Sequence, residues 1–249
     1  LDIKDVNNDN KPDIIVGRYQ YLNYTTAVIY INTTTSSVPT FDLPVNLSKS
    51  TAASEGSHAV YAEDINLDGN RDILSGQAWV TNGDIFQNNY TSGSFSASSF
   101  SAAISTPGFN SSSSNWTWSI DVADFNGDAK PDIITSDFNG GSAAMILTNN
   151  NTMGVASTIA GSSFASNYIT GLSSYGNSFG IDLDNDGKPD FVSFDFNNIV
   201  IGRNKICDNP TVTATANQTV CYDASVTLAG SGASSYTWDN GVTNGVSFQ

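Results

Sequence analysis

The 249-residue chain has little basic charge, since nine Lys and Arg stand against 24 Asp and Glu and the formal net charge is −15. A surface with this charge repels phosphates, which argues against nucleic acid or an anionic membrane as a partner. Glutamate is also scarce, because only Glu55 and Glu63 accompany 22 aspartates. Glu favours helices, whereas Asp favours turns and metal loops, so long helices are not expected. No apolar run approaches the ~20 residues of a membrane-spanning helix.

Four segments of the chain share one pattern and align without gaps. They are DVNNDNKPDII from Asp5, DINLDGNRDIL from Asp64, DFNGDAKPDII from Asp124 and DLDNDGKPDFV from Asp182. Their starts lie 59, 60 and 58 residues apart, which indicates one supersecondary unit copied along the chain.

Each unit contains short segments of alternating polarity, such as HAVYAEDI before a loop and DIIVGRYQ after one, which are typical of half-buried strands. Further strands are expected in TAVIYINTT, GDIFQNN, AAMILTNN and NIVIGRN. Fourth strands are expected in FDLPVNL, FSASSFSAA and MGVASTIA, whereas the last unit offers three strands before Cys207. Roughly 60 residues with four antiparallel strands have the size of a propeller blade. The predicted fold class is therefore all-β.

Oxygen-bearing side chains recur at positions 1, 3, 5 and 9, counted from the first Asp of each loop. Such donors suit Ca²⁺, which takes six to eight oxygens, and the backbone carbonyl at position 7 would add another. The predicted side-chain ligands are Asp5, Asn7, Asp9 and Asp13; Asp64, Asn66, Asp68 and Asp72; Asp124, Asn126, Asp128 and Asp132; and Asp182, Asp184, Asp186 and Asp190. The predicted carbonyl ligands are Lys11, Asn70, Lys130 and Lys188.

About four Ca²⁺ ions, one per loop, are therefore expected, in a structural role because no nucleophile or base accompanies them. Position 6 calls for a residue that tolerates positive φ, which fits Gly69, Gly187 and Asn10, whereas Ala129 departs from the rule. The alternative is that these loops are Asx-turns in Asp-rich hairpins without an ion. Against it, thirteen Asp residues crowd into the four loops and would repel one another without a cation.

These loops resemble the FG-GAP/VCBS-type propeller repeats, and the resemblance covers residues 1–205. The dipeptide that names the family survives as Phe179-Gly180. The resemblance implies a seven-bladed extracellular propeller with structural calcium, of which this chain would supply four blades.

Residues 206–249 differ in character, with Thr/Val alternation in short segments typical of a sandwich. The run NQTVCYDASVTLAGSGASSYTWDNGVTNGVSF resembles part of the Ig-like modules of secreted and surface proteins in Bacteroidetes. A local Cys207–Cys221 bridge is one option, but the resemblance implies a partner for Cys221 near the end of the module, beyond this chain. Because no initiator Met or signal-like segment precedes Leu1, we expect the chain to be a piece of a longer protein.

Residues that could perform chemistry are few. His58 is the only histidine, and no GxSxG, CxxC, HExxH or Gly-rich phosphate loop is present, so a structural role is favoured over catalysis. Trp116 and Trp118 lie two residues apart, and packing between blades is favoured over sugar stacking. Tyr19, Tyr21 and Tyr24 are interpreted in the same way.

The leading hypothesis is a non-enzymatic, calcium-stabilised extracellular propeller that serves as an adhesion or binding scaffold for a polysaccharide or surface protein. The alternative is the propeller portion of a polysaccharide-degrading enzyme such as a lyase. A basic cluster at the central channel would favour the lyase, whereas Arg18, Arg71 and Arg203 are scattered along the sequence. A structural spacer that binds only calcium is a third possibility.

Overall fold

The computed structural model describes residues 1–19, 25–49, 55–112, 114–137, 144–154, 157–168, 176–195, 197–205, 213–214, 225–231 and 243–248. The chain divides into two compact units, Leu1–Asn204 and Lys205–Gln249. The helical segments of the described residues are two 3-10 turns, η1 (Ala97–Ser99) and η2 (Gly161–Ser163), and all other regular structure is β. The prediction of an all-β fold is confirmed. None of these segments is a helix long and apolar enough to cross a membrane.

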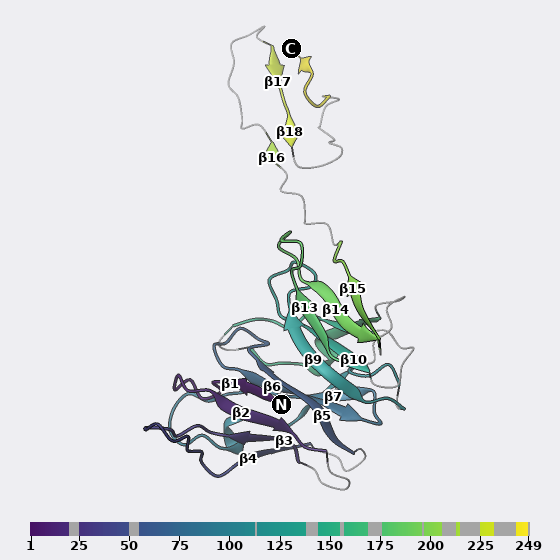
Figure 1. Ribbon diagram of the computed structural model, residues 1–249. Coiled ribbons are helices and arrows are strands. Elements are labelled where there is room, and N and C mark those ends of the chain that lie inside the picture. The colour runs from purple at the N-terminus through teal and green to yellow at the C-terminus, as the bar shows by residue number, and fades with distance from the viewer. Residues whose placement is uncertain are drawn as a thin grey trace. The chain divides into compact units, whose positions relative to one another are not determined.

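The larger unit contains four antiparallel sheets, one for each repeat (Figure 1). The first sheet consists of β1 (Asp2–Lys4), β2 (Asp13–Gly17), β3 (Thr25–Tyr30) and β4 (Val45–Ser48). The second consists of β5 (Glu55–Glu63), β6 (Asp72–Ala78), β7 (Asn82–Phe86) and β8 (Ile104–Pro107). The third consists of β9 (Thr117–Ala123), β10 (Asp132–Asp137), β11 (Met145–Asn149) and β12 (Phe164–Tyr168). The fourth consists of β13 (Ser178–Ile181), β14 (Asp190–Asp195) and β15 (Asn198–Gly202).

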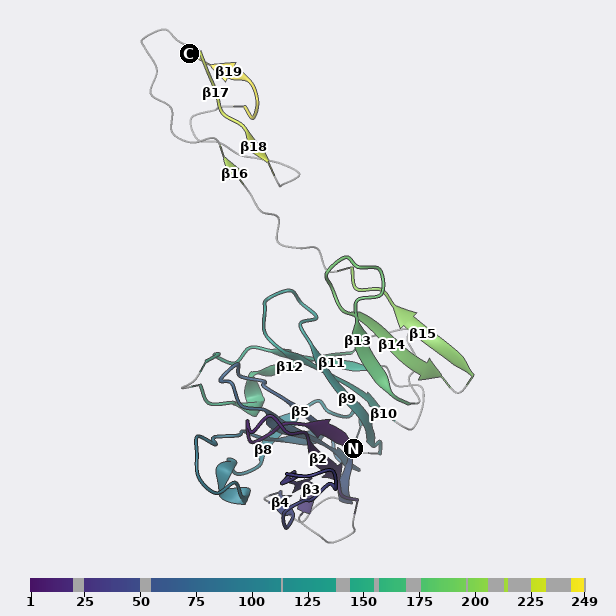
Figure 2. The ribbon, with the colours of Figure 1, turned by 60° about the vertical axis from the view of Figure 1, so that its left-hand side comes forward.

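Strands that follow one another in sequence are also neighbours in each sheet, as expected for repeated blades. The first strands of the sheets pack against one another in order, β1 on β5, β5 on β9 and β9 on β13. Figures 1 and 2 both show the β13–β15 sheet beside β9 and β10. The arrangement is consistent with successive blades whose innermost strands are β1, β5, β9 and β13.

Two of the predicted fourth strands were wrong. In the second repeat, residues 95–103 form η1 and a single bridge between Phe100 and Asn88, and the fourth strand is β8 further along the chain. In the third repeat the described part of residues 153–160 contains no strand, and the fourth strand is β12. The reason is that Phe100 and Ile159 fill the core between sheets, so their apolar character does not mark a strand.

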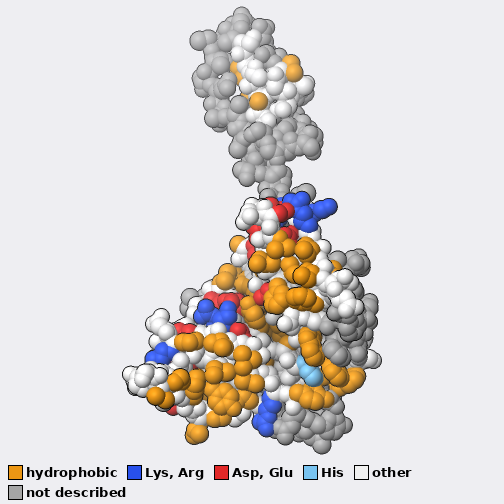
Figure 3. All heavy atoms as spheres, in the orientation of Figure 1, with side chains coloured by type: hydrophobic (Ala, Val, Ile, Leu, Met, Phe, Trp, Pro, Cys, Tyr) orange, Lys and Arg blue, Asp and Glu red, His pale blue; other side chains and the backbone are white. Residues whose placement is uncertain are grey.

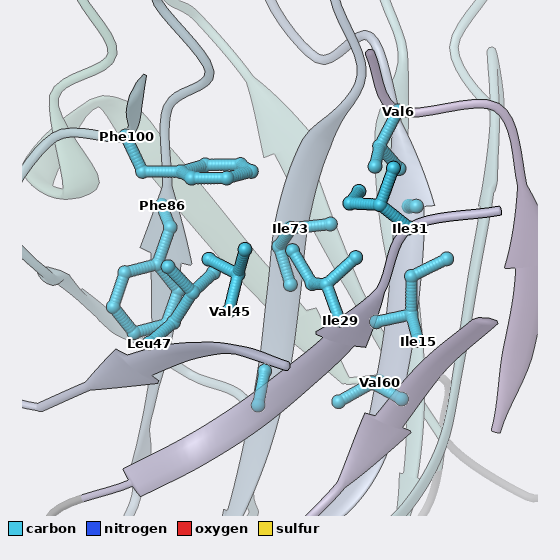
Figure 4. Packing of buried hydrophobic residues seen from close by; sticks show 12 residues of the cluster. Val6, Ile15, Ile29, Ile31, Val45, Leu47, Val60, Ile73, Phe86 and Phe100 are labelled. Carbon is cyan, nitrogen blue, oxygen red and sulfur yellow. The ribbon is translucent and has the colours of Figure 1, made fainter. Parts of the chain in front are cut away.

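The hydrophobic core lies between successive sheets. Between the first and second sheets, Ile15 and Ile29 meet Val60 and Ile73 in one cluster (Figure 4). A second cluster fills the space between the second and third sheets, and a smaller one around Phe125, between the third and fourth. Alternation along the strands therefore directs apolar side chains into the spaces between blades.

Gly76 on β6 permits one of the closest approaches between sheets. A Cβ at this position would lie 2.4 Å from the Cβ of Thr117 on β9, so a side chain larger than hydrogen would force the second and third sheets apart.

The smaller unit contains two short antiparallel pairs. Strand β16 (Thr213–Ala214) pairs with β18 (Gly230–Ser231), and β17 (Val226–Thr227) pairs with β19 (Ser247–Phe248). Cys207, Cys221 and the SYTWDNG segment lie outside the described residues, as do Tyr21 and Tyr24. The resemblance to an Ig-like module therefore stays an expectation.

Candidate metal centres in the four repeat loops

Each predicted loop joins the first strand of its sheet to the second, and one set of hydrogen bonds gives all four loops the same shape. The carboxylate of Asp5, at position 1, accepts the backbone N–H of Asp9 on Oδ1 (3.2 Å) and that of Asn10 on Oδ2 (2.7 Å). The position-1 carboxylates that make the same pair of contacts are Asp64, Asp124 and Asp182. These are the contacts of Asx-turns, as the ion-free alternative also requires.

Position 6 is left-handed in every loop, as the sequence predicted for three of them. The φ values are 63° at Asn10, 95° at Gly69 and 85° at Gly187. Ala129, expected to depart from the rule, adopts φ 64° and keeps the third loop in the common shape. Its Cβ makes this conformation costly, by roughly 1–2 kcal/mol.

Position 4 is left-handed too, which sequence reasoning missed. Its φ values are 60° at Asn8, 56° at Leu67, 76° at Gly127 and 59° at Asn185. Asn and Gly tolerate this conformation, so three of the four residues carried a signal for it.

At position 5, the carboxylate accepts the N–H of the position-7 residue, the residue whose carbonyl is a predicted ligand. Oδ1 of Asp9 accepts from Lys11 at 2.9 Å, and Oδ1 of Asp68 accepts from Asn70 at 2.8 Å. The other two loops contain the same contact, from Lys130 to Asp128 and from Lys188 to Asp186. Positions 5 and 7 are thus held together at the turn.

The position-9 carboxylates are buried in all four loops, with Asp13, Asp72 and Asp132 at 0% exposure and Asp190 at 2%. In each loop Oδ2 accepts the N–H of position 2, as from Ile65 to Asp72 at 3.1 Å. Oδ1 accepts the N–H of an asparagine at or just beyond the end of the third strand, at 2.8 Å in all four loops. These asparagines are Asn32, Asn88, Asn149 and Asn204.

Sequence reasoning missed these asparagines, which we call the latch asparagines, although one follows the third strand of every repeat. The amide of Asn88 donates to the carbonyl of Arg71 in its own loop (3.1 Å) and to that of Val6 in the preceding loop (2.8 Å). Asn149 and Asn204 make the same two contacts, to their own loops and to the loop of the preceding sheet. The latch asparagines therefore tie each metal loop to its neighbour.

Burial makes the ionised form of the position-9 carboxylates less favourable. Desolvation raises the pKa of Asp72 to about 8 and that of Asp132 to about 6, and it also raises the pKa of Asp13. The backbone hydrogen bonds act in the opposite direction, whereas the charges at positions 1 and 5 raise these pKa values further. A cation among the carboxylates would favour their ionised forms.

The donor chemistry fits a hard cation. Carboxylate oxygens of Asp182, Asp184 and Asp190 lie within 4.8 Å of one another, and this group could hold a metal. In the second loop, Oδ1 of the fully buried Asn66 has no hydrogen-bond partner among the described residues, and Asn66 is a predicted position-3 ligand. Because a carboxylate oxygen has two acceptor sites, the N–H contacts leave capacity for a metal. In the fourth loop, Arg203 forms ion pairs with Asp184 and Asp186.

Comparison with known proteins supports this geometry. The model of the FG-GAP-like repeat matches residues 5–75 and residues 64–135. Each match runs from one metal loop into the strand that follows the next metal loop, β6 or β10. Repeats of this kind often bind calcium and are typical of extracellular proteins. The comparison with curated proteins gives no match. Since the matched residues extend from 5 to 135, more than half of the 249 residues, the chain belongs to the FG-GAP-like repeat family.

Proposed function

We propose that this chain is a calcium-stabilised scaffold in a secreted or cell-surface protein, and that its blades present a binding surface for a glycan or a protein in adhesion. Each loop would hold one Ca²⁺ through positions 1, 3, 5, 7 and 9. The observation that carries the proposal is the buried Oδ1 of Asn66, which accepts no hydrogen bond from the part of the chain that the structure describes. An orphaned acceptor costs about 1–3 kcal/mol, which a cation at this position would offset.

The four sheets would be blades of a seven-bladed propeller, with Lys205–Gln249 as part of an Ig-like module. The order in which β1, β5, β9 and β13 pack supports the propeller, because these strands would line its centre. Nothing in the described residues favours the lyase alternative.

Chelation tests the calcium proposal directly. Calcium at 100 times its Kd adds about 2.7 kcal/mol per filled loop. A loss of this size lowers the Tm of a 150–250-residue domain by ~5–10 °C. We therefore expect excess EDTA to lower the Tm of the full chain by at least that amount, measured by differential scanning calorimetry.

The variant Asp186→Ala should lower the Tm in calcium and reduce the further shift caused by EDTA. Its matched control is Asp42→Ala, which removes an exposed carboxylate outside the loops and should keep the full EDTA shift. A melt of the unaltered chain that EDTA leaves unchanged would refute the calcium proposal.

A further inference from the structure

Five aromatic side chains from the first three sheets come together, and we call them the aromatic platform: Tyr19, His58, Trp79, Trp116 and Trp118. The ring centroids of Tyr19 and His58 are 4.5 Å apart, and those of His58 and Trp116 are 4.9 Å apart with planes only 3° from parallel. Trp79 meets Trp116 edge to face at 5.2 Å, and Trp118 lies 6.3 Å from His58. The contacts join blades that are adjacent in the row of sheets.

The platform lies at the ends of the sheets that are remote from the metal loops. Each metal loop connects the end of a first strand to the start of a second strand. Tyr19 and Trp79 instead follow the ends of β2 and β6, and the other three residues lie at the starts of β5 and β9. Because first and second strands are antiparallel, these positions share the opposite end of each sheet. The structure thus separates a metal-bearing face from an aromatic face.

Two platform residues occupy the same irregular position in their repeats. His58 and Trp118 each lie six residues before the first Asp of the loop that follows. On β5, the residues on either side of His58 pair with adjacent residues of β6, so His58 is the extra residue of a β-bulge. On β9, Trp118 is likewise the extra residue opposite Ser136 and Asp137. Bulges redirect side chains and are frequent beside functional sites.

Trp79 has a strained backbone that its surroundings hold in place. Its φ is 61°, a left-handed conformation that is an outlier for a bulky residue and costs about 1–3 kcal/mol. Its N–H donates to the carbonyl of Asn115 at 3.0 Å, and Ala78 forms a bridge with Trp116. The Asn115 amide in turn donates to the buried Asp137 at 2.9 Å. The backbone that carries the ring is therefore held in place before any ligand arrives, which lowers the entropy lost on binding.

The platform is also open to solvent, although its rings contact one another between the sheets. Tyr19, Trp79 and Trp118 are 51%, 41% and 39% exposed, and only Trp116 and His58 are half-buried. Figure 3 shows the pale-blue histidine side chain at the surface beside hydrophobic side chains. Grouped exposed apolar residues on a folded domain mark interaction sites.

The charge and ring geometry select the ligand. Nucleobases also stack on aromatic rings, but the −15 charge of the chain opposes a phosphate backbone, and it equally opposes uronate polymers. A quaternary ammonium ion fits rings that enclose it, whereas here His58 and Trp116 stack on each other and the most exposed rings are those of Tyr19, Trp79 and Trp118. A neutral pyranose presents an apolar C–H face to such rings, whose π faces are negative, and it keeps its hydroxyls in water.

From these observations we infer that the aromatic platform binds a neutral polysaccharide by stacking pyranose rings on Tyr19, Trp79 and Trp118. The inference rests on the proposed scaffold function and gives it a site and a ligand class. Because the platform residues come from three sheets, successive sugars of one chain would contact successive blades, and each contact would add to the affinity.

The full chain in saturating calcium is titrated with cellohexaose, laminarihexaose, xylohexaose and mannohexaose by isothermal titration calorimetry. At least one of these neutral hexasaccharides should bind, and Trp118→Ala should raise its Kd at least tenfold. Trp79→Gly should weaken binding similarly without lowering the Tm, because glycine accepts the positive φ. The matched pair Tyr19→Ala and Tyr30→Ala compares two exposed tyrosines, and only the first should weaken binding.

Trigalacturonate and choline are titrated in the same way as charged comparison ligands. The inference is overturned if none of the four hexasaccharides binds, or if only trigalacturonate or choline binds. It is also overturned if Trp118→Ala and Trp79→Gly bind as well as the unaltered chain. The Tm of the same samples in EDTA separates the two proposals. Absent sugar binding with an EDTA-sensitive Tm refutes the platform alone, whereas sugar binding with an EDTA-insensitive Tm refutes the calcium scaffold alone.

Discussion

Asp84 on β7 is a buried acid that has no part in the metal loops. Its side chain is 5% exposed, and the amide of Gln77 donates to its Oδ2. Desolvation raises the pKa of Asp84 to about 6, and the charge of Lys49, itself 6% exposed, opposes this rise. Since Lys49 follows β4 of the first sheet and Asp84 lies on β7 of the second, this electrostatic interaction acts between the two sheets.

The raised pKa predicts how stability depends on pH. A folded-state pKa of about 6, above the ordinary 3.8, means that the folded protein holds the proton more tightly than the unfolded chain. The stabilisation is present below about pH 4 and is lost as the pH rises through 6, by ~3 kcal/mol in the free energy of unfolding. In saturating calcium, urea unfolding from pH 4 to 7 should show this decline, and Asp84→Asn should abolish it. Equal slopes for the two proteins would show that Asp84 is already ionised at pH 4.

At the scale of the elements, the latch asparagines connect the metal loops of neighbouring sheets, which the strand pairing does not connect. Asn149, at the end of β11, donates to the carbonyl of Pro131 in its own loop at 2.9 Å and to that of Ile65 in the neighbouring loop at 3.0 Å. The Asn149 side chain is fully buried, so water does not compete with it for these two carbonyls. Two adjacent metal loops thus depend on one amide group.

Replacement of this amide should destabilise the protein strongly. Asn149→Ala removes the donor to the carbonyls of Ile65 and Pro131, at about 1–3 kcal/mol each, so we expect a loss of ~2–6 kcal/mol in urea unfolding. The matched control is its neighbour Asn150→Ala, an exposed residue with one long contact of 3.5 Å to Thr148, which should cost under ~0.5 kcal/mol. If the two variants lose the same stability, the latch has no energetic role.

Strands and loops could be predicted from the sequence because their signals are local. Ile133 and Ile134 follow Asp132 directly, and both the apolar run and the spacing of the aspartates lie within a dozen residues. The fourth strands of the second and third sheets could not be predicted in this way. Phe100 and Ile159 have strand-like surroundings in sequence, but they are buried against the preceding sheet, which no local pattern reveals.

The same limit applies to the sites. The latch contact between Asn88 and Val6 spans 82 residues, so the sequence offers a recurring Asn but not its partner. The aromatic platform depends on bulges at His58 and Trp118, and a bulge is defined by the pairing with a second strand. By contrast, the predicted metal ligands lie within nine residues of one another, and the structure places them in one common loop shape.

At the scale of the whole molecule, the middle sheets of the larger unit differ from the fourth. Strands β6 and β10 are buried along their entire lengths, because a sheet covers each of their faces. On the fourth sheet, in contrast, Phe194, Ile199 and Ile201 are 45%, 64% and 58% exposed. Ile199 pairs with Phe194, and Ile201 lies two residues along β15, so the three share one face. A contiguous apolar face of this kind indicates an interaction surface.

We expect this face to be covered by another sheet of the same repeat type, and a second copy of the chain can supply one in solution. Analytical ultracentrifugation at about 0.5 M salt, where the −15 charge is screened, should therefore show a weight-average mass that rises above 26.3 kDa with concentration. The double variant Ile199→Lys, Ile201→Lys should remain at the monomer mass, because it places charge on the face. Val38→Lys, Leu43→Lys adds the same charge at exposed positions of the first repeat and should still associate. If the unaltered chain stays monomeric at every concentration, the apolar face of the fourth sheet does not pair with another blade.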